Sequence, residues 1–126
     1  MAQIFMAIAA VLGGLSVAAG AFGSHALRER LSDRAAEIFE IATRYQMYHA
    51  LALLLVGILL SRAETAQALL TGSGYAFIAG ILIFSGSLYA ISLSQIKVLG
   101  AIAPVGGLAL MIGWGCLAIA ALNFKG

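Results

Sequence analysis

Four long apolar runs occupy most of this sequence, at about residues 3–23, 45–61, 69–94 and 98–122. The short segments between them hold nearly all of the charged residues. A helix needs about 20 mostly apolar residues to cross a bilayer, so each run is close to the length of one span. The chain is also 63% hydrophobic and 10% charged, too little polar surface to cover a water-soluble globule of 126 residues. The sequence therefore predicts a multi-pass integral membrane protein.

The connections between the runs are short, and short connections join neighbouring helices in antiparallel order. The predicted fold is all-α, an up-and-down transmembrane bundle of four helices with both termini on one side. No repeat, low-complexity tract or linker interrupts the sequence, so we expect residues 1–126 to form a single integral membrane domain. The first run is counted as a span because, unlike a signal peptide, it has no Lys or Arg before it.

The segment before the second apolar run has the pattern of an amphipathic helix. Its charged residues recur at steps of four, three and four positions, so they share one helical face. They are Asp33, Glu37, Glu40 and Arg44. Ser32 or Asp33 is suited to cap the start of this helix. We expect one continuous helix from about Asp33 to Arg62, whose first turns project from the bilayer as a solvated extension.

The charged and reactive residues argue against several classes of protein. Seven Lys or Arg and five Asp or Glu are thinly scattered, so no basic patch for nucleic acid is present. The single cysteine, Cys116, cannot form an intrachain disulfide and is expected to be a packing residue. There is no nucleotide-binding motif, and no nucleophile stands at a recognisable spacing from a base. We therefore predict a protein that is not an enzyme and holds no cofactor.

Polar and helix-breaking residues of all four runs lie toward the same membrane face. His49 stands about 20 Å along its helix from Arg62, which places it about 10 Å below the opposite face of the hydrocarbon core. Counted inward from Lys97, Pro104 lies at a similar depth. The third run brings its serines to the same side, where the first run ends at His25. The resulting candidate binding cluster contains His25, Tyr45, Gln46, His49, Ser85, Ser87, Tyr89, Pro104, Gly106 and Gly107.

Four short motifs contain most of these residues: GAFGSH (20–25), YQMYHALALL (45–54), FSGSLY (84–89) and PVGG (104–107). In these motifs, their order and their spacing, the chain resembles a family of small membrane proteins of unknown function. That family is typified by bacterial YgdD and YwdK and has transmembrane relatives in animals. The resemblance covers nearly the whole chain. It implies four transmembrane helices, a location in the plasma or inner membrane of the cell, and no established activity.

His49 lies on the side of its helix away from the charged face. We expect its ring to be neutral and to face the bundle or a neighbouring subunit, because lipid cannot satisfy its nitrogens. The expected partners are Ser24, Ser85, Ser87, Tyr89, the backbone carbonyls of residues 20–23, and carbonyls freed by Pro104.

Small residues recur four positions apart in the first and third runs, a spacing that lets membrane helices approach closely. These sets are Ala9 with Gly13, Ser16 with Gly20 and Ser24, and Gly86 with Ala90 and Ser94. We expect Gly13, Gly20 and Gly107 to face neighbouring helices. Pro104, which lacks a backbone N–H, predicts a bend within the fourth run.

Three functions remain open at this stage. The preferred one is a structural or accessory protein, alone or as a homo-oligomer in the lipid bilayer, whose polar cluster joins helices. The second is a small-solute channel or transporter, because intramembrane ionisable residues mark such paths. The third is a haem-binding or metal-binding redox protein that uses His25 and His49. The two histidines differ in depth by on the order of 10 Å, too far to share one small metal ion, so no metal site is assigned.

Overall fold

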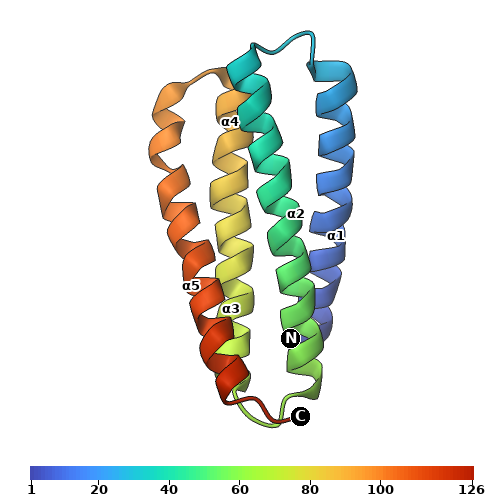
Figure 1. Cartoon of the computed structure of the whole chain (residues 1–126), viewed down its shortest axis with the longest axis vertical. Helices are drawn as coiled ribbons and strands as arrows, with labels where there is room; N and C mark the ends of the chain where they lie inside the picture. The colour runs from blue at the N-terminus through green and yellow to red at the C-terminus, as the bar shows by residue number, and fades with distance from the viewer.

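The chain folds into antiparallel helical rods, and both termini lie toward the same end (Figure 1). The computed structural model describes all residues, 1–126. Its α-helices are α1 (Ala2–Phe22), α2 (Asp33–Arg62), α3 (Gln67–Gly80), α4 (Gly86–Ser94) and α5 (Ala103–Leu122). Two π-helical segments, η1 (Gly23–Leu27) and η2 (Ile81–Ser85), extend α1 and connect α3 to α4. A 3-10 segment, η3 (Lys97–Ala101), leads into α5.

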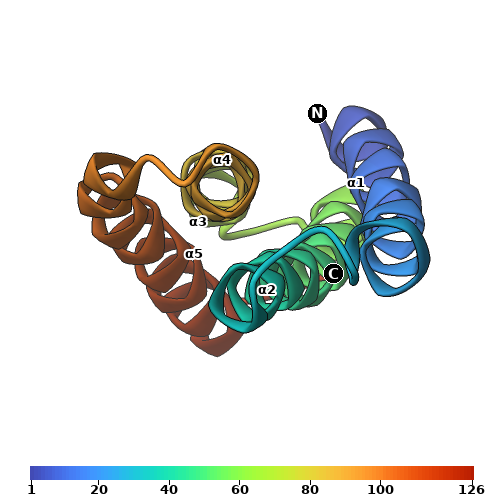
Figure 2. The same ribbon diagram turned by 90° about the horizontal axis from the view of Figure 1, so that it is seen from above.

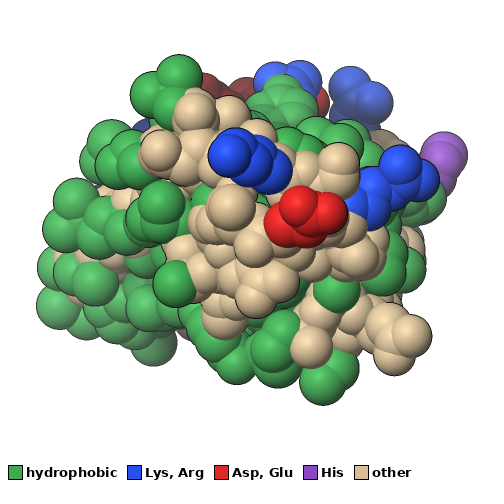
Figure 3. Space-filling model, turned by 90° about the horizontal axis from the view of Figure 1, so that it is seen from below, with side chains coloured by type: hydrophobic (Ala, Val, Ile, Leu, Met, Phe, Trp, Pro, Cys, Tyr) green, Lys and Arg blue, Asp and Glu red, His purple; other side chains and the backbone are tan.

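Four helical units are long and apolar enough to cross a membrane: Ala2–Leu27, Asp33–Arg62, Gln67–Ser94 and Lys97–Leu122. The predicted all-α, four-span fold is therefore confirmed. Large hydrophobic side chains cover the outside of the rods, and Val11, Leu55 and Met111 are 61%, 55% and 64% exposed. Seen from the end that holds the termini, the few charged side chains lie among hydrophobic flanks (Figure 3). Such a surface suits a lipid environment.

Helix α2 is continuous over 30 residues, as predicted from its charged face and its capping residue. The side chain of Ser32 accepts the backbone N–H of Ala35 at 3.1 Å, which caps the helix start. In the first turns of the helix, Arg34 lies 3.3 Å from Glu37, and both side chains are well exposed. The amphipathic extension before the second span is thus part of the same helix as the span.

The four rods pack in chain order around an open arc, with α1 and α5 outermost (Figure 2). Helix α2 packs against α1 on one side and against α3 and α4 on the other. Helix α5 packs against α3 and η2, while the backbones of α2 and α5 are not in close contact. Side chains must therefore make the connection between α2 and α5.

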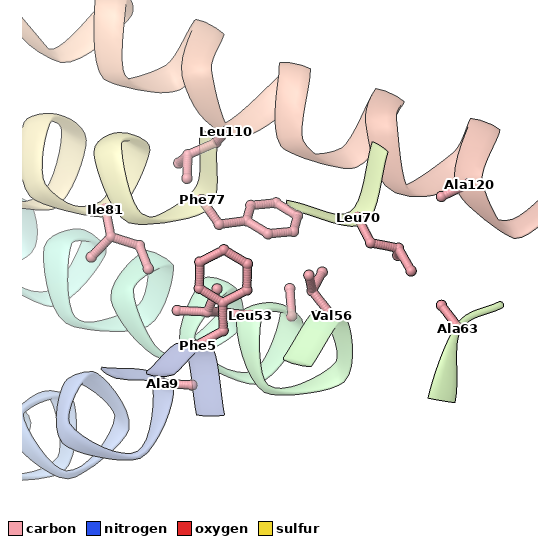
Figure 4. Packing of buried hydrophobic residues seen from close by; sticks show 11 residues of the cluster. Phe5, Ala9, Leu53, Val56, Ala63, Leu70, Phe77, Ile81, Leu110 and Ala120 are labelled. Atoms are coloured by element: carbon pink, nitrogen blue, oxygen red, sulfur yellow. The ribbon is translucent and has the colours of Figure 1, made fainter. Parts of the chain in front are cut away.

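The apolar core lies in the half of the bundle nearest the termini. Phe5, Leu53 and Phe77 are completely buried there and bring together α1, α2 and α3 (Figure 4). The ring of Phe77 also packs against Gly113 of α5, where an added Cβ would lie 2.7 Å from the ring. The buried polar side chains Ser16, Gln46 and Ser85 lie farther from the termini than this core, whereas buried Ser73 lies beside it and donates to the carbonyl of Gly113 at 2.7 Å.

The π-helical segment η2 determines which residues of the third span face the neighbouring helices. Residues four apart drift around a straight α-helix, because a turn contains 3.6 residues. A π-helical turn contains more residues, since its hydrogen bonds run from i to i+5, and it offsets this drift. Phe77, Ile81 and Ser85 are consequently all at most 3% exposed, and Tyr89 also reaches α2.

Pro104 does not bend the middle of a helix, contrary to our prediction. It is at the start of α5, where the missing N–H would have no partner within the helix. The helix geometry of the fourth span changes at the junction between the 3-10 segment η3 and α5.

The small-residue predictions are only partly right. An added Cβ at Gly13 would lie 4.0 Å from Ala50, and one at Gly107 would lie 3.8 Å from Phe84, so both face neighbours. Gly20 and Gly86 have nothing within 4 Å of that position, so the predicted contacts there are wrong. Gly86 and Ser94 of the predicted set in α4 are exposed, and the third span faces α2 through Ser85 and Tyr89 instead.

Candidate functional site

Three polar side chains follow one another along α2, and the last of them lies at the edge of the apolar core. Thr43, Gln46 and His49, here called the α2 polar stripe, are 8%, 6% and 6% exposed. Each successive α-helical residue turns by about 100°, so a step of three residues moves the stripe by about 60° around the helix. The stripe therefore faces a different neighbour at each step.

The first neighbour is α1. The hydroxyl of Ser16 donates to the backbone carbonyl of Thr43 at 2.6 Å, within a fully packed contact. The amide nitrogen of Gln46 donates to the backbone carbonyl of Leu12 at 2.8 Å. Two hydrogen bonds, one from each helix, thus join α1 to α2.

The second neighbour is the rod formed by η2 and α4. The phenol of Tyr89 donates to the amide oxygen of Gln46 at 2.6 Å. The hydroxyl of Ser85 donates to the backbone carbonyl of Ala42 at 2.8 Å. Gln46 consequently bridges two helices, using its nitrogen toward α1 and its oxygen toward α4.

The third neighbour is α5, which the stripe reaches through His49. The indole N–H of Trp114 donates to Nε2 of His49 at 3.0 Å. Because Nε2 accepts this bond, the proton of a neutral ring must be on Nδ1. Nδ1 lies 2.7 Å from the backbone carbonyl of Tyr45, to which it donates. Both ring nitrogens are therefore satisfied in one neutral tautomer.

Aromatic rings surround His49 and fill the space between α2 and α5. Its ring centroid lies 6.0 Å from that of Tyr45 in a nearly parallel arrangement, and 5.8 Å from that of Trp114 in an edge contact. The ring of Phe77 lies 5.7 Å away on the side of the apolar core. These contacts supply the packing that the separated backbones of α2 and α5 do not.

The buried polar atoms of the protein are mutually satisfied. No buried side-chain nitrogen or oxygen lacks a hydrogen-bond partner. No group of three His, Cys, Asp or Glu side chains lies close enough together to hold a metal ion. Several of the hydrogen bonds in the cluster join one helix to another.

The family model described as "Protein of unknown function (DUF423)" matches residues 19–107, which is most of the chain and includes the α2 polar stripe. This chain belongs to the DUF423 family. It is 43% identical to the UPF0382 membrane protein of Staphylococcus epidermidis, over 98% of this chain and 99% of that protein.

Two further relatives agree with this family assignment. UPF0382 membrane protein SAB0533 of Staphylococcus aureus is 44% identical over 98% of this chain and 99% of its own length. YwdK of Bacillus subtilis is 38% identical over 97% and 98%. No solved structure matches the chain. The resemblance is thereby confirmed, and this DUF423 chain is a membrane protein whose relatives have no assigned activity.

The structure places half of the predicted site residues in hydrogen bonds along the same stretch of α2, with Tyr45 taking part through its backbone carbonyl. These are Tyr45, Gln46, His49, Ser85 and Tyr89. Of the others, Ser87 donates within its own helix to the carbonyl of Phe84 at 2.9 Å. Gly106 is buried against the backbone of Phe84, and Gly107 contacts its ring. His25 and Pro104 are exposed and lie outside this set of hydrogen bonds.

The inward position of His49 is confirmed, but the partners predicted for it are wrong. Tyr89 and Ser85 bind other groups of α2, and the nitrogens of His49 bind Tyr45 and Trp114 instead. Sequence reasoning missed Trp114. A signal was present: it is the one tryptophan of the chain, and its indole N–H needs an acceptor within an apolar run.

Proposed function

We propose that this protein is a non-enzymatic structural or accessory membrane protein in which α2 joins the other three spans. The observation that supports this role most directly is the reach of the α2 polar stripe. The backbone carbonyl of Thr43 accepts a hydrogen bond from α1, the side chain of Gln46 bonds to α1 and α4, and the ring of His49 bonds to α5. Interhelical hydrogen bonds of this kind stabilise membrane helices, which have no hydrophobic force between them.

The polar atoms of the cluster already have hydrogen-bond partners within the protein, which favours the structural role over a path for solutes. A transport site needs groups that can exchange partners with a solute. The amide of Gln46 and both nitrogens of His49 are already bound to protein groups. A solute at this position would have to break bonds between helices.

We further propose a location in the plasma or inner membrane of the cell, with the lipid bilayer as the principal partner. The four apolar rods and the names of the bacterial relatives as membrane proteins support this location. Fractionation of cells that express the full chain tests it, and recovery in any other fraction would argue against it. Assembly into a homo-oligomer is a separate proposal, tested by crosslinking in native membranes.

A flux assay in liposomes tests the proposed role. The purified chain is reconstituted, and the permeation of potassium ions, protons and small neutral solutes is compared with empty liposomes and with a known channel. We expect rates equal to those of empty liposomes. A flux that rises with the amount of protein and disappears in His49→Leu would assign the cluster to transport.

The same preparation separates the role of His49 in stability from a role in binding. His49→Leu should lower the free energy of unfolding by about 1 kcal/mol, a typical value for an intramembrane hydrogen bond. Leu51→Ala, at a position on the same helix that is 53% exposed, serves as the control for side-chain replacement. An optical spectrum with a Soret band, or bound metal by elemental analysis, would instead support the redox alternative.

A further inference from the structure

A cleft of about 730 Å³ opens beside the start of α2, at the end of the bundle away from the termini. Helix α2, helix α4 and the segment from η3 to the start of α5 form its three walls. Figure 2 looks down on this end of the bundle. The cleft lies on the far side of α2 from α1, so the hydrogen bonds between α1 and α2 do not occupy it.

The walls of the cleft are apolar below its rim. Ile38 and Ile41 come from α2, and Leu88 and Ile91 come from α4. All four side chains are partly exposed, so each retains surface available to a ligand. The distance along α2 from Arg34 at the rim to Ile41 is about 10 Å, at 1.5 Å per residue. The cleft therefore offers an apolar channel about two helical turns deep.

The rim of the cleft is cationic. Arg34 and Lys97 are among its lining residues, together with the polar side chains Ser32 and Gln95, and no Asp or Glu is. Arg34 pairs with Glu37 at 3.3 Å, but both side chains are more than 60% exposed, so this pair is weak and can exchange. Lys97 is exposed and forms no ion pair. The rim consequently favours an anionic group.

A second cleft opens at the same end of the bundle, and its lining has no excess of positive charge. The cationic rim is therefore a feature of the first cleft and not of this whole end of the bundle. The second cleft has a volume of about 590 Å³, lies between the end of α1 and the start of α2, and is mostly polar. Two arginines and three acidic side chains line it, so their charges nearly cancel: Arg28, Arg44, Asp33, Glu37 and Glu40. Only the first cleft combines apolar walls with cationic side chains and no acidic side chain in its lining.

We infer that the first cleft binds an anionic phospholipid, with its phosphate at Arg34 and Lys97 and an acyl chain along the isoleucines and leucines below. A small soluble anion would use the rim and leave the apolar walls uncovered, whereas an amphiphile matches both parts. Cationic side chains at the level of lipid headgroups attract anionic lipids, and each contributes to the affinity. This inference goes beyond the proposed joining of helices and does not depend on it.

Native mass spectrometry of the full chain in detergent tests the inference. Bound phosphatidylglycerol is compared with bound phosphatidylcholine of the same acyl chains. Arg34→Gln with Lys97→Gln should reduce the preference for phosphatidylglycerol by about tenfold. The control pair, Arg62→Gln with Lys125→Gln, removes the same charge from the opposite end and should leave the preference unchanged.

A steric pair of variants tests the apolar channel without changing charge. Gly100 lines the cleft, and an added Cβ would lie 3.7 Å from Ile91, so a side chain can be accommodated there. Gly100→Leu should fill the channel and lower the occupancy of both lipids. Gly115→Leu places the same side chain where nothing lies within 4 Å of the added Cβ, outside the cleft, and should have no effect.

The outcomes separate the lipid site from its alternatives. Equal effects of the two charge pairs would show that binding follows net charge, and equal effects of the two leucine variants would show that the channel is not used. Either result overturns the inference. Displacement of the lipid by an equal concentration of glycerol phosphate would also overturn it, because the apolar walls would then contribute nothing. If the charge variants do not fold, the leucine pair still decides.

Discussion

The indole of Trp114 donates its N–H to Nε2 of His49 at 3.0 Å, and so connects α5 to α2 where the two backbones are not in close contact. Trp114 is 46% exposed, whereas His49 is 6% exposed. The indole therefore lies at the outer edge of the bundle and covers the ring of His49 from that side. The bond also fixes which nitrogen of His49 carries a proton.

The first prediction is the tautomer of His49. Because Nε2 accepts from Trp114, the ring should be neutral with its proton on Nδ1. Nitrogen-15 NMR of the histidine-labelled chain in bilayers at neutral pH measures both ring nitrogens directly. We expect Nδ1 to give the signal of a protonated nitrogen and Nε2 that of an unprotonated one. The opposite tautomer, or a doubly protonated ring, would show that the Trp114 bond does not form.

The second prediction compares two adjacent glycines of α5. An added Cβ at Gly106 would overlap backbone atoms of Phe84, which cannot move away cheaply, whereas at Gly107 it would lie at an ordinary contact distance of 3.8 Å. Gly106→Ala should therefore lower the free energy of unfolding by about 1–3 kcal/mol, the range for overpacking. Gly107→Ala should leave it unchanged or slightly raised. Titration with sodium dodecyl sulfate measures both variants, and equal stabilities would contradict the close approach of α5 to η2.

The third prediction concerns the bridge made by Gln46. Gln46→Leu removes the bonds to Leu12 and Tyr89, so we expect a loss of about 1–2 kcal/mol at roughly 0.6–1 kcal/mol per bond. Tyr89→Phe removes only one bond and should cost about half as much.

The control for Gln46 is Gln3→Leu, since Gln3 is exposed and makes no side-chain hydrogen bond. Leucine is more favourable than glutamine in hydrocarbon, so without a bridge Gln46→Leu would be neutral or stabilising. Folding measured for the three variants in the same detergent distinguishes these results. A Gln46→Leu protein as stable as the wild type would mean that the bridge does not hold α1 and α4 to α2.

Much of this fold could be predicted because each helix is encoded locally. The apolar runs give the four rods, and Ser32 with the charged face of residues 33–44 gives the start and continuity of α2. The burial of His49 followed from its place on the face opposite those charges. These features depend on residues close to one another in the sequence.

The partners within the site could not be predicted, because they depend on the register between helices. Whether His49 meets Tyr89 of α4 or Trp114 of α5 depends on the positions of both helices along α2, which no local pattern encodes. The π-helical segment η2 was not predicted from the sequence either. It changes which residues of the third span face α2. The predicted bend at Pro104 was wrong for a related reason. A proline bends a helix when it lies inside it and is tolerated when it lies at its start, and the sequence did not show that α5 begins beside Pro104.

The central claim is that the α2 polar stripe joins the spans, and a double-mutant cycle between His49 and Trp114 tests it most directly. The free energy of unfolding is measured in bilayers for His49→Leu, Trp114→Phe, the double variant and the wild type. Trp114→Phe keeps an aromatic ring and removes the N–H donor, so the cycle isolates the hydrogen bond. We expect a favourable coupling of about 0.6–1.7 kcal/mol, between the average and the largest value from double-mutant cycles on intramembrane hydrogen bonds. Strictly additive effects of the two substitutions would show that the pair does not hold α5 to α2 and would contradict the claim.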